Sequence, residues 1–174
     1  MTFRRLLAAF AAFALAGCAS VDVADYRAER PVLDLARYFN GTVDGWGMFQ
    51  DRSGRVVKRF RVRIDATWEG NAGTLDEHFE YSDGTTERRV WKLVRDGDRY
   101  TGTAGDVVGT AEGAAAGNAL HWRYVLALAV DGRTWHVDMD DWMFLVDETT
   151  LLNRTTMSKF GVKVGEVTLS FRKR

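Results

Sequence analysis

The sequence predicts an all-β domain: an up-and-down antiparallel β-barrel of about ten strands, preceded by a short helical turn. Long stretches of the 174-residue chain alternate apolar and polar residues with period two, as strands with one buried face do. Turn sequences containing Asp and Gly separate these stretches, and short turns join antiparallel neighbours. A meander of this length folds into a sandwich or closes into a barrel. We expect the barrel, because closure leaves no exposed strand edge.

The N-terminus resembles a bacterial lipoprotein signal peptide. Arg4 and Arg5 supply positive charge, and residues 6–16 form an apolar run of 11 residues. A bilayer core requires roughly 20 apolar residues, so this run fits a signal peptide better than a membrane span. The run ends in Leu15-Ala16-Gly17-Cys18, which resembles a lipobox. The resemblance implies removal of residues 1–17 and lipid attachment at Cys18; the alternative is an ordinary secretory signal with an incidental cysteine.

The segment after the lipobox is expected to connect the anchor to the domain. Cys18 is the only cysteine, so acylation leaves no free thiol and no disulfide. Ala19 follows it, which by resemblance to the sorting rule of enteric bacteria implies the periplasmic face of the outer membrane. Residues 19–29 are predicted to be a polar tether and residues 30–39 a short helix with Pro31 in its first turn. We therefore assign residues 1–17 to the signal peptide, 18–37 to the lipidated cysteine, tether and helix, and 38–174 to the barrel.

Alternation defines the strands in order along the chain. In residues 55–68, Val62 and Ile64 alternate with Arg61 and Arg63, which gives one apolar and one basic face. Residues 118–130, 133–146 and 167–171 repeat the pattern, with Trp135 placed on the same inward face as Val137. Turn signals separate the runs at residues 51–54, 82–84, 95–98, 115–118 and 130–132.

The basic strand face argues against a membrane-spanning barrel. A packed interior has no room for Arg59, Arg61 and Arg63, and each would cost about 2–4 kcal/mol facing lipid at mid-membrane. We therefore expect an apolar interior and a water-facing wall, with the lipid anchor as the membrane contact. Without Arg4 and Arg5 the chain has 22 basic and 24 acidic residues, a net charge of −2. Nucleic acid is not an expected partner, and the oligomeric state is left open.

Six motifs resemble one protein family. They are residues 46–54 (from Trp46), 79–84, 89–91, 118–124, 141–143 and 153–161. They make the chain from residue 39 onward similar to an uncharacterised family of proteobacterial lipoproteins, domain-of-unknown-function family 3833. The resemblance implies a lipid-linked role, since genes for membrane fatty-acid modification are associated with the family. The architecture also resembles lipocalins and fatty-acid-binding proteins. However, Gly45-Trp46-Gly47 lacks their Gly-x-Trp hallmark, so this likeness concerns shape and not function.

Sequence patterns of catalysis and metal binding are weak. His78, His121 and His136 fall on polar strand faces without a paired spacing, so we expect no metal site and no cofactor. Residues 102–113 are rich in glycine but lack the lysine and following helix of a phosphate loop, and are predicted to form hairpin turns and bulges. No catalytic residue is assigned, although a catalytic triad can assemble from distant positions.

Charged residues on apolar strand faces are the candidate site. Glu77 shares a face with Phe79, Asp141 with Met143, and Arg89 with Trp91. Buried charges cost several kcal/mol unless they are paired, so Arg89 is expected to pair with both carboxylates. The cluster is either a structural ion-pair network or part of a ligand site. The candidate ligand-binding residues are Glu77, Arg89, Trp91, Tyr124, Asp141 and Asn153.

Three functions remain open. The first is a membrane-anchored periplasmic barrel that binds a fatty acyl chain or another apolar molecule in its cavity. The second is a structural or assembly lipoprotein with a filled barrel that acts through protein contacts. The third, which we favour least, is an enzyme of membrane fatty-acid modification. An internal cavity distinguishes the first function from the second.

Overall fold

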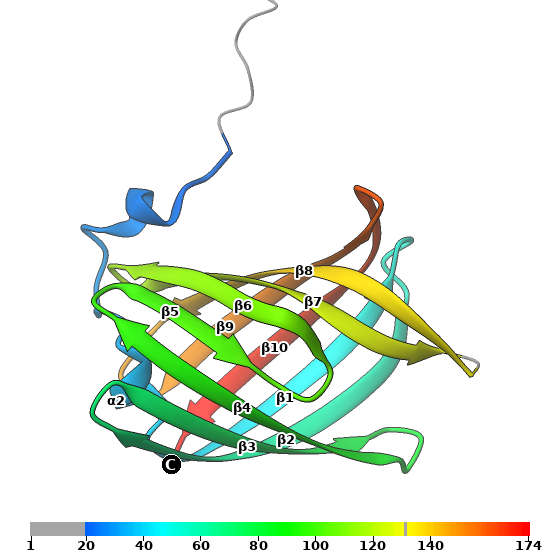
Figure 1. Cartoon of the computed structure of the whole chain (residues 1–174), viewed down its shortest axis with the longest axis horizontal. Helices are drawn as coiled ribbons and strands as arrows, with labels where there is room; N and C mark the ends of the chain where they lie inside the picture. The colour runs from blue at the N-terminus through cyan, green and yellow to red at the C-terminus, as the bar shows by residue number, and fades with distance from the viewer. Residues whose placement is uncertain (1–19, 131) are drawn as a thin grey trace, which may run out of the picture.

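The computed structural model describes residues 20–130 and 132–174; the predicted signal peptide and Cys18 lie outside this range. Ten antiparallel strands form one closed barrel in which consecutive strands pair and the first pairs with the last (Figure 1). The predicted up-and-down barrel is therefore confirmed. The strands are β1 (Gly41–Asp51), β2 (Val56–Glu69), β3 (Ala72–Tyr81), β4 (Thr86–Asp96), β5 (Arg99–Thr103), β6 (Val107–Ala116), β7 (Ala119–Val130), β8 (Arg133–Leu145), β9 (Thr150–Lys159) and β10 (Val162–Lys173).

The alternation in β2 decides which face points inward. Val62 and Ile64 are buried, whereas Arg61 and Arg63 are exposed on the outer wall. Arg61 Nη2 lies 2.6 Å from Glu80 Oε2 on the neighbouring strand β3. Such exposed pairs contribute at most about 1 kcal/mol, so burial of the apolar face is what fixes the orientation of the strand.

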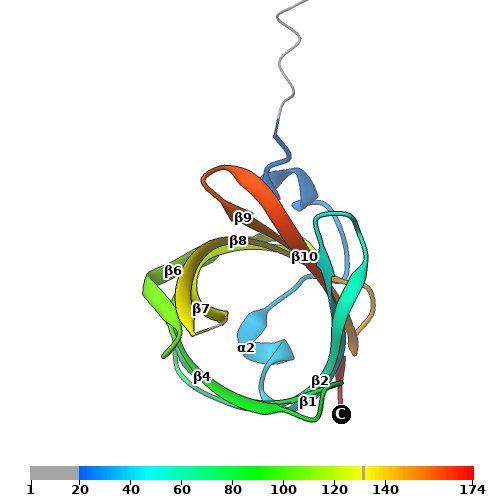
Figure 2. The ribbon, with the colours of Figure 1, turned by 90° about the vertical axis from the view of Figure 1, so that its right-hand side faces the viewer.

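A short helix closes one end of the barrel. Helix α2 (Leu35–Tyr38) lies within the ring of strands in the view along the barrel (Figure 2), and Leu35 and Phe39 are buried in the core. The Phe39 ring packs edge-on against Phe171 of β10, with 5.6 Å between the ring centroids. The Tyr38 hydroxyl donates a hydrogen bond to the carbonyl of Thr149 at 2.9 Å. The helix therefore plugs this end of the interior.

The predicted helix over residues 30–39 was too long. The Asp34 side chain accepts a hydrogen bond from the Arg37 backbone N–H at 3.2 Å and caps the helix, so the helix begins only at Leu35. Pro31 precedes the helix and lies outside its first turn.

The prediction of a polar tether over residues 19–29 was wrong from Asp22 onward. A 3-10 helix, η1 (Val23–Tyr26), follows the Asp22 cap. The Tyr26 ring packs edge-on against Phe144 at 5.1 Å and tilted against Trp142 at 5.9 Å. Gly117 carries a positive φ of 55° and its backbone lies so close to the Tyr26 carbonyl that a side chain would collide with it. This segment is therefore held on the outer wall.

The end opposite the plug carries protruding hairpins. The last pair that β6 forms with β7 joins Val107 to Leu126, and β9 first pairs with β8 at Ser158 and Asp138. Beyond both points the β7–β8 hairpin continues, within the described residues, without a paired strand on either side. Trp135, predicted to face inward, is consequently 42% exposed.

The glycine-rich stretch forms the hairpin of β5 and β6, with an irregular register between Val108 and Glu112, as the sequence predicted. In the part of the chain that the structure describes, no helix has the length and apolar character needed to cross a membrane.

Candidate ligand-binding site in the barrel interior

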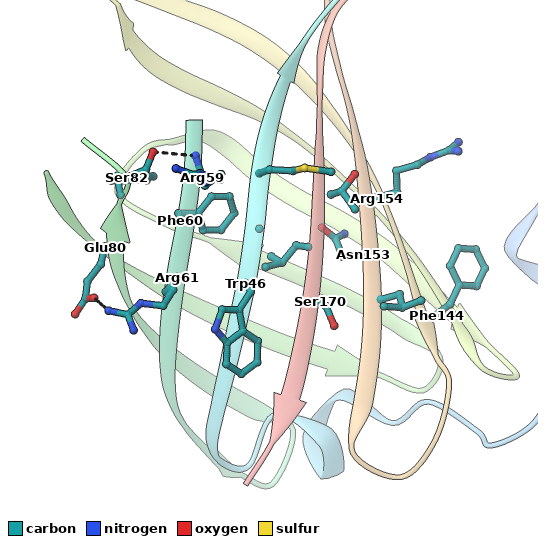
Figure 3. A pocket seen from close by; sticks show the side chains of 16 residues that line it. Trp46, Arg59, Phe60, Arg61, Glu80, Ser82, Phe144, Asn153, Arg154 and Ser170 are labelled. Carbon is teal, nitrogen blue, oxygen red and sulfur yellow. Dashed lines mark hydrogen bonds and ion pairs between the residues drawn. The ribbon is translucent and has the colours of Figure 1, made fainter. Parts of the chain in front are cut away.

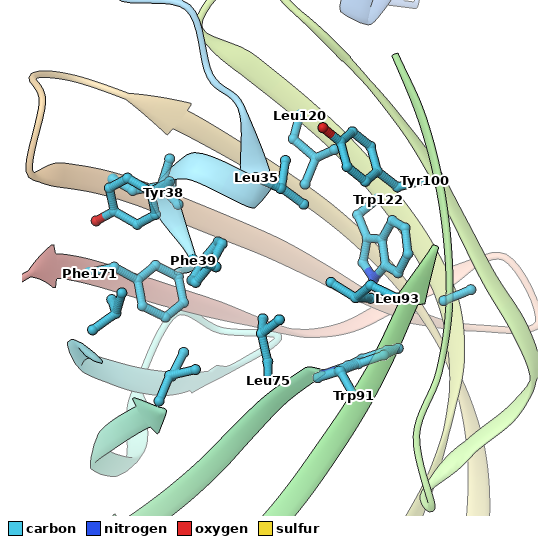
Figure 4. Packing of buried hydrophobic residues seen from close by; sticks show 14 of the residues in the cluster. Leu35, Tyr38, Phe39, Leu75, Trp91, Leu93, Tyr100, Leu120, Trp122 and Phe171 are labelled. Atoms are coloured by element: carbon cyan, nitrogen blue, oxygen red, sulfur yellow. The ribbon is translucent and has the colours of Figure 1, made fainter. Parts of the chain in front are cut away.

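The barrel encloses a cavity of about 140 Å³ between the α2 plug and the opposite mouth. Leu35 and Phe39 contribute to the lining from the plug, and Phe60 and Phe79 from the mouth side. Apolar side chains from the strands form the rest of the surroundings. Several of these are visible in Figure 4: Leu75, Trp91, Leu93, Leu120, Trp122 and Phe171.

The structure brings all six predicted site residues to this one cavity. They reach it from five strands, because each occupies an inward position in the alternation: Glu77 (β3), Arg89 and Trp91 (β4), Tyr124 (β7), Asp141 (β8) and Asn153 (β9). The polar residues form two groups, one around Arg89 and one around Asp141.

The Arg89 group joins two carboxylates to one guanidinium. Glu77 is directly opposite Arg89 in the β3–β4 ladder, with 3.7 Å between Glu77 Oε2 and Arg89 Nη1. Arg89 donates its hydrogen bonds to Asp106 instead, from Nε to Oδ2 at 2.9 Å and from Nη2 to the same oxygen at 2.6 Å. Burial lowers the pKa of Arg89, but the neighbouring carboxylates more than offset this and raise it above its usual value. Arg89 is therefore charged.

Asp106 was missed by the sequence analysis. It lies in the turn between β5 and β6, where no alternation assigns a side chain to the interior. An acid within a run of small residues was the only available signal.

Glu77 has an incomplete set of partners. Its Oε2 atom is buried and accepts no hydrogen bond. Burial raises the pKa of Glu77 to about 7, against the opposing effect of Arg89, and the carboxylates of Asp106 and Asp141 raise it further. Near neutral pH this side chain is therefore poised between its protonated and ionised forms, with one oxygen free for a ligand.

The Asp141 group is built from strand β9. Asp141 accepts hydrogen bonds from the Thr155 hydroxyl and from Asn153 Nδ2, the latter at 3.3 Å. Burial raises the pKa of Asp141 to about 6, while these hydrogen bonds oppose the rise. The expectation that Arg89 pairs with both carboxylates was wrong for Asp141, because its close partners are neutral. Thr155 was also missed, since a threonine in a strand carries no distinctive signal.

An aromatic wall adjoins the charged groups. The Trp91 ring lies edge-on to Tyr124, with 5.4 Å between centroids, and edge-on to Trp122 at 5.9 Å. Burial raises the pKa of Tyr124 well above its usual value, so its phenol stays protonated. The cavity thus combines apolar walls with two polar groups, one containing Glu77 and Arg89 and the other containing Asp141.

Metal coordination has no evident site within residues 20–130 and 132–174, where no three His, Cys, Asp or Glu side chains are grouped to hold an ion. The histidines occupy outer positions. His121, for example, stacks on Trp142 with 4.1 Å between ring centroids and lies 3.1 Å from the Asp140 carboxylate.

A second hollow lies on the outer wall, over β1, β2, β9 and β10 (Figure 3). Trp46, which is 50% exposed, and Leu152, which is 46% exposed, form part of its lining. Arg61 and Ser170 add polar groups to it. This groove is open to solvent.

A family model described as "Protein of unknown function (DUF3833)" matches residues 12–173. No curated protein matches the chain. Among solved structures, the S-type phycobiliprotein lyase CPES from Guillardia theta is similar in fold, with 9% sequence identity and a TM-score of 0.55 over 78% of this chain and 88% of that chain. A de novo designed fluorescence-activating β-barrel has 14% identity and a TM-score of 0.45 over 82% of this chain and 99% of the design. The likeness to the lyase concerns the barrel fold alone.

Proposed function

This chain belongs to the DUF3833 family, and we propose that its barrel binds a small apolar molecule that carries a hydrogen-bond donor. One observation carries the proposal: an apolar cavity of about 140 Å³ is lined by Glu77, whose buried Oε2 accepts no hydrogen bond. Buried polar atoms are nearly always paired, so an orphaned acceptor beside a cavity suggests a missing partner.

The charges favour a neutral or cationic polar group on the ligand. The cavity region holds three carboxylates, Glu77, Asp106 and Asp141, against the one guanidinium of Arg89, whose Nε and Nη2 already donate to Asp106. A free carboxylate entering the cavity would meet like charges in a poorly solvated site. An ammonium, hydroxyl or amide N–H instead supplies the donor that Glu77 lacks.

The volume of the cavity limits the apolar part of the ligand. About 140 Å³ is close to the roughly 150 Å³ of an engineered protein cavity that holds benzene, and well below the about 300 Å³ at which pockets for larger ligands begin. The ligand is therefore a small molecule or a short chain. A complete long fatty acid exceeds the available space.

We further propose that the barrel works at a membrane. The lipobox-like sequence supports lipid attachment at Cys18 and a location on the periplasmic face of the outer membrane. The proposed role is binding or carriage of the ligand, and we assign no catalytic residue.

A scaffold role is the second candidate. It is favoured by the outer groove, where the exposed Trp46 and Leu152 flank Ser170 on neighbouring strands, near charged residues. Exposed tryptophan is typical of protein-binding surfaces. In that case the interior cluster would serve stability alone.

Native mass spectrometry of the full-length protein, followed by solvent extraction and identification of any adduct, tests the proposal. We expect an adduct that is lost in Leu75→Phe, which fills the cavity, and retained in Leu152→Phe on the outer wall. Circular dichroism would verify that both variants keep the barrel. An adduct with a free carboxylate, or one that is unaffected by Leu75→Phe, would overturn the proposal; so would a protein that takes up no added amine or alcohol.

A further inference from the structure

We propose that the tip of the β9–β10 hairpin, residues 158–164, contacts the surface of an anionic phospholipid bilayer. This hairpin tip is separate from the interior cavity. The inference therefore goes beyond the ligand-binding role and does not depend on it.

Phe160 is the first reason. Its side chain is 91% exposed, and its φ of 51° lies in the left-handed region, where glycine and asparagine are favoured. Neither the turn nor the core accounts for a large aromatic residue at this position. An exposed aromatic ring is, however, well suited to the boundary between lipid headgroups and acyl chains.

The residues beside Phe160 extend the apolar surface. Val162 is 62% exposed and Val164 is 41% exposed, both on β10. The exposed ring of Trp135 on the β7–β8 hairpin lies nearby, because Lys159 Nζ sits 5.0 Å from the centroid of its ring and 4.8 Å from that of Phe160. Together they make an apolar patch at the end of the molecule.

The charge of the hairpin tip favours a membrane over a neutral protein surface. Residues 158–164 include Lys159 and Lys163 but no acidic residue; Lys163 is paired with Glu166 at 2.7 Å, so Lys159 carries the free positive charge at the tip. An unpaired lysine close to an anionic bilayer adds about 1 kcal/mol of attraction, a contribution that Lys159 can make. Aromatic, aliphatic and lysine side chains in this combination are typical of segments that lie in the membrane interface.

The N-terminal segment supplies the second point of contact. In both ribbon views the blue N-terminal segment and the tip of the β9–β10 hairpin lie on the same, upper side of the barrel (Figures 1 and 2). Tyr26 fixes this segment to the barrel through its packing on Phe144. A bilayer on that side would therefore meet both the N-terminal segment and the hairpin, with the barrel axis parallel to it.

A fluorescent probe of membrane contact tests this arrangement. The full-length protein with Phe160→Cys, labelled with an environment-sensitive dye, is mixed with vesicles of phosphatidylglycerol and phosphatidylethanolamine. We expect a blue shift of the emission and quenching by spin-labelled lipids. Thr86→Cys is the matched control, because Thr86 is exposed at the start of β4, beside the β3–β4 turn, which lies on the opposite side of the barrel (Figure 1). The unsubstituted chain corrects for dye on Cys18. The proposal would be overturned if the dye at Phe160→Cys showed no blue shift, or if its blue shift and quenching equalled those of the dye at Thr86→Cys.

A second variant separates membrane contact from folding. Asparagine tolerates a positive φ, so Phe160→Asn should keep or raise the thermal midpoint while the blue shift of a probe at Val162→Cys is lost. If Phe160→Asn lowers the thermal midpoint and the blue shift at 162 persists, Phe160 serves the fold and the inference is wrong.

Discussion

Glu77 faces Arg89 directly across the β3–β4 ladder, yet Arg89 gives its short hydrogen bonds to Asp106. The guanidinium stands 3.7 Å from Glu77 Oε2, near enough for Coulomb attraction but too far for a hydrogen bond. The barrel thus holds a guanidinium that donates hydrogen bonds to Asp106 and a buried carboxylate oxygen of Glu77 that accepts none. This asymmetry underlies the first two predictions and the final one.

Arg89→Met should strongly destabilise the protein. Two largely buried carboxylates, Glu77 and Asp106, would lose their cation, which costs about 3–5 kcal/mol of unfolding free energy. Urea denaturation at pH 8 measures the change. The matched control is Arg88→Met: Arg88 is the next residue on β4, points outward and pairs with Asp76 at 2.7 Å. Its loss should cost less than about 1 kcal/mol. Equal costs for the two variants would show that the interior position of Arg89 has no special role.

Glu77→Gln should change how stability depends on pH. Folding raises the pKa of Glu77 from 4.5 to about 7, because the protonated side chain is better tolerated in the barrel than the ionised one. The stabilisation from this difference is complete below pH 4.5 and is lost as the pH rises to about 7. That shift corresponds to roughly 3 kcal/mol. The variant should therefore lose less stability than the wild type between these two pH values. Denaturation curves at pH 5 and pH 8 measure this, and Glu80→Gln, exposed on the same strand, should behave as the wild type. Identical curves for all three proteins would contradict the assigned pKa.

Gly47→Ala should be destabilising because the Phe60 ring occupies the space of the added methyl group. Overpacking of this kind costs about 1–3 kcal/mol. In a Phe60→Leu background the same change should cost less, with a coupling energy of about 0.5–3 kcal/mol in a double-mutant cycle. Gly105→Ala, where nothing lies within 4 Å, is the control and should be nearly neutral. Strict additivity of the two substitutions would refute this packing contact.

Lipid attachment at Cys18 predicts incorporation of a palmitate analogue. Cells fed an alkyne-tagged palmitate should yield labelled protein, and Cys18→Ser should remove the label because this is the only cysteine in the chain. Label that persists in Cys18→Ser, or a wild type that never acquires it, would mean that the N-terminus is an ordinary secretory signal or no signal at all.

Alternation of apolar and polar residues predicts the strands of the barrel well, because successive side chains of any β-strand point to opposite faces of the sheet. It placed Val62, Glu77 and Asp141 inside and Arg61 outside without any knowledge of which strands pair. It failed at Trp135, since alternation states which side of the sheet a residue occupies but not whether the barrel extends that far. A helix was predicted before the first strand but over too long a range, because Pro31 was taken as the start of its first turn. The residue that caps the helix is Asp34.

The candidate site was only partly predictable. Alternation can identify each charged side chain that points into the barrel. It cannot identify the partners of these side chains when the partners lie in turns, where apolar and polar residues do not alternate. Asp106 sits in such a turn and takes the hydrogen bonds of Arg89. Thr155 faces Asp141 across the β8–β9 ladder, a register that the sequence alone does not set.

The selectivity of the cavity for the ligand's polar group tests the central claim most directly. Ligand-observed NMR at pH 8 can compare pentylamine, pentanol and pentanoate, which share one chain and differ in that group. The account predicts that pentylamine and pentanol bind, that pentanoate does not, and that Glu77→Gln weakens the amine while Glu80→Gln leaves it unchanged. Binding of pentanoate as tight as that of pentylamine, or no binding of any of the three, would contradict it.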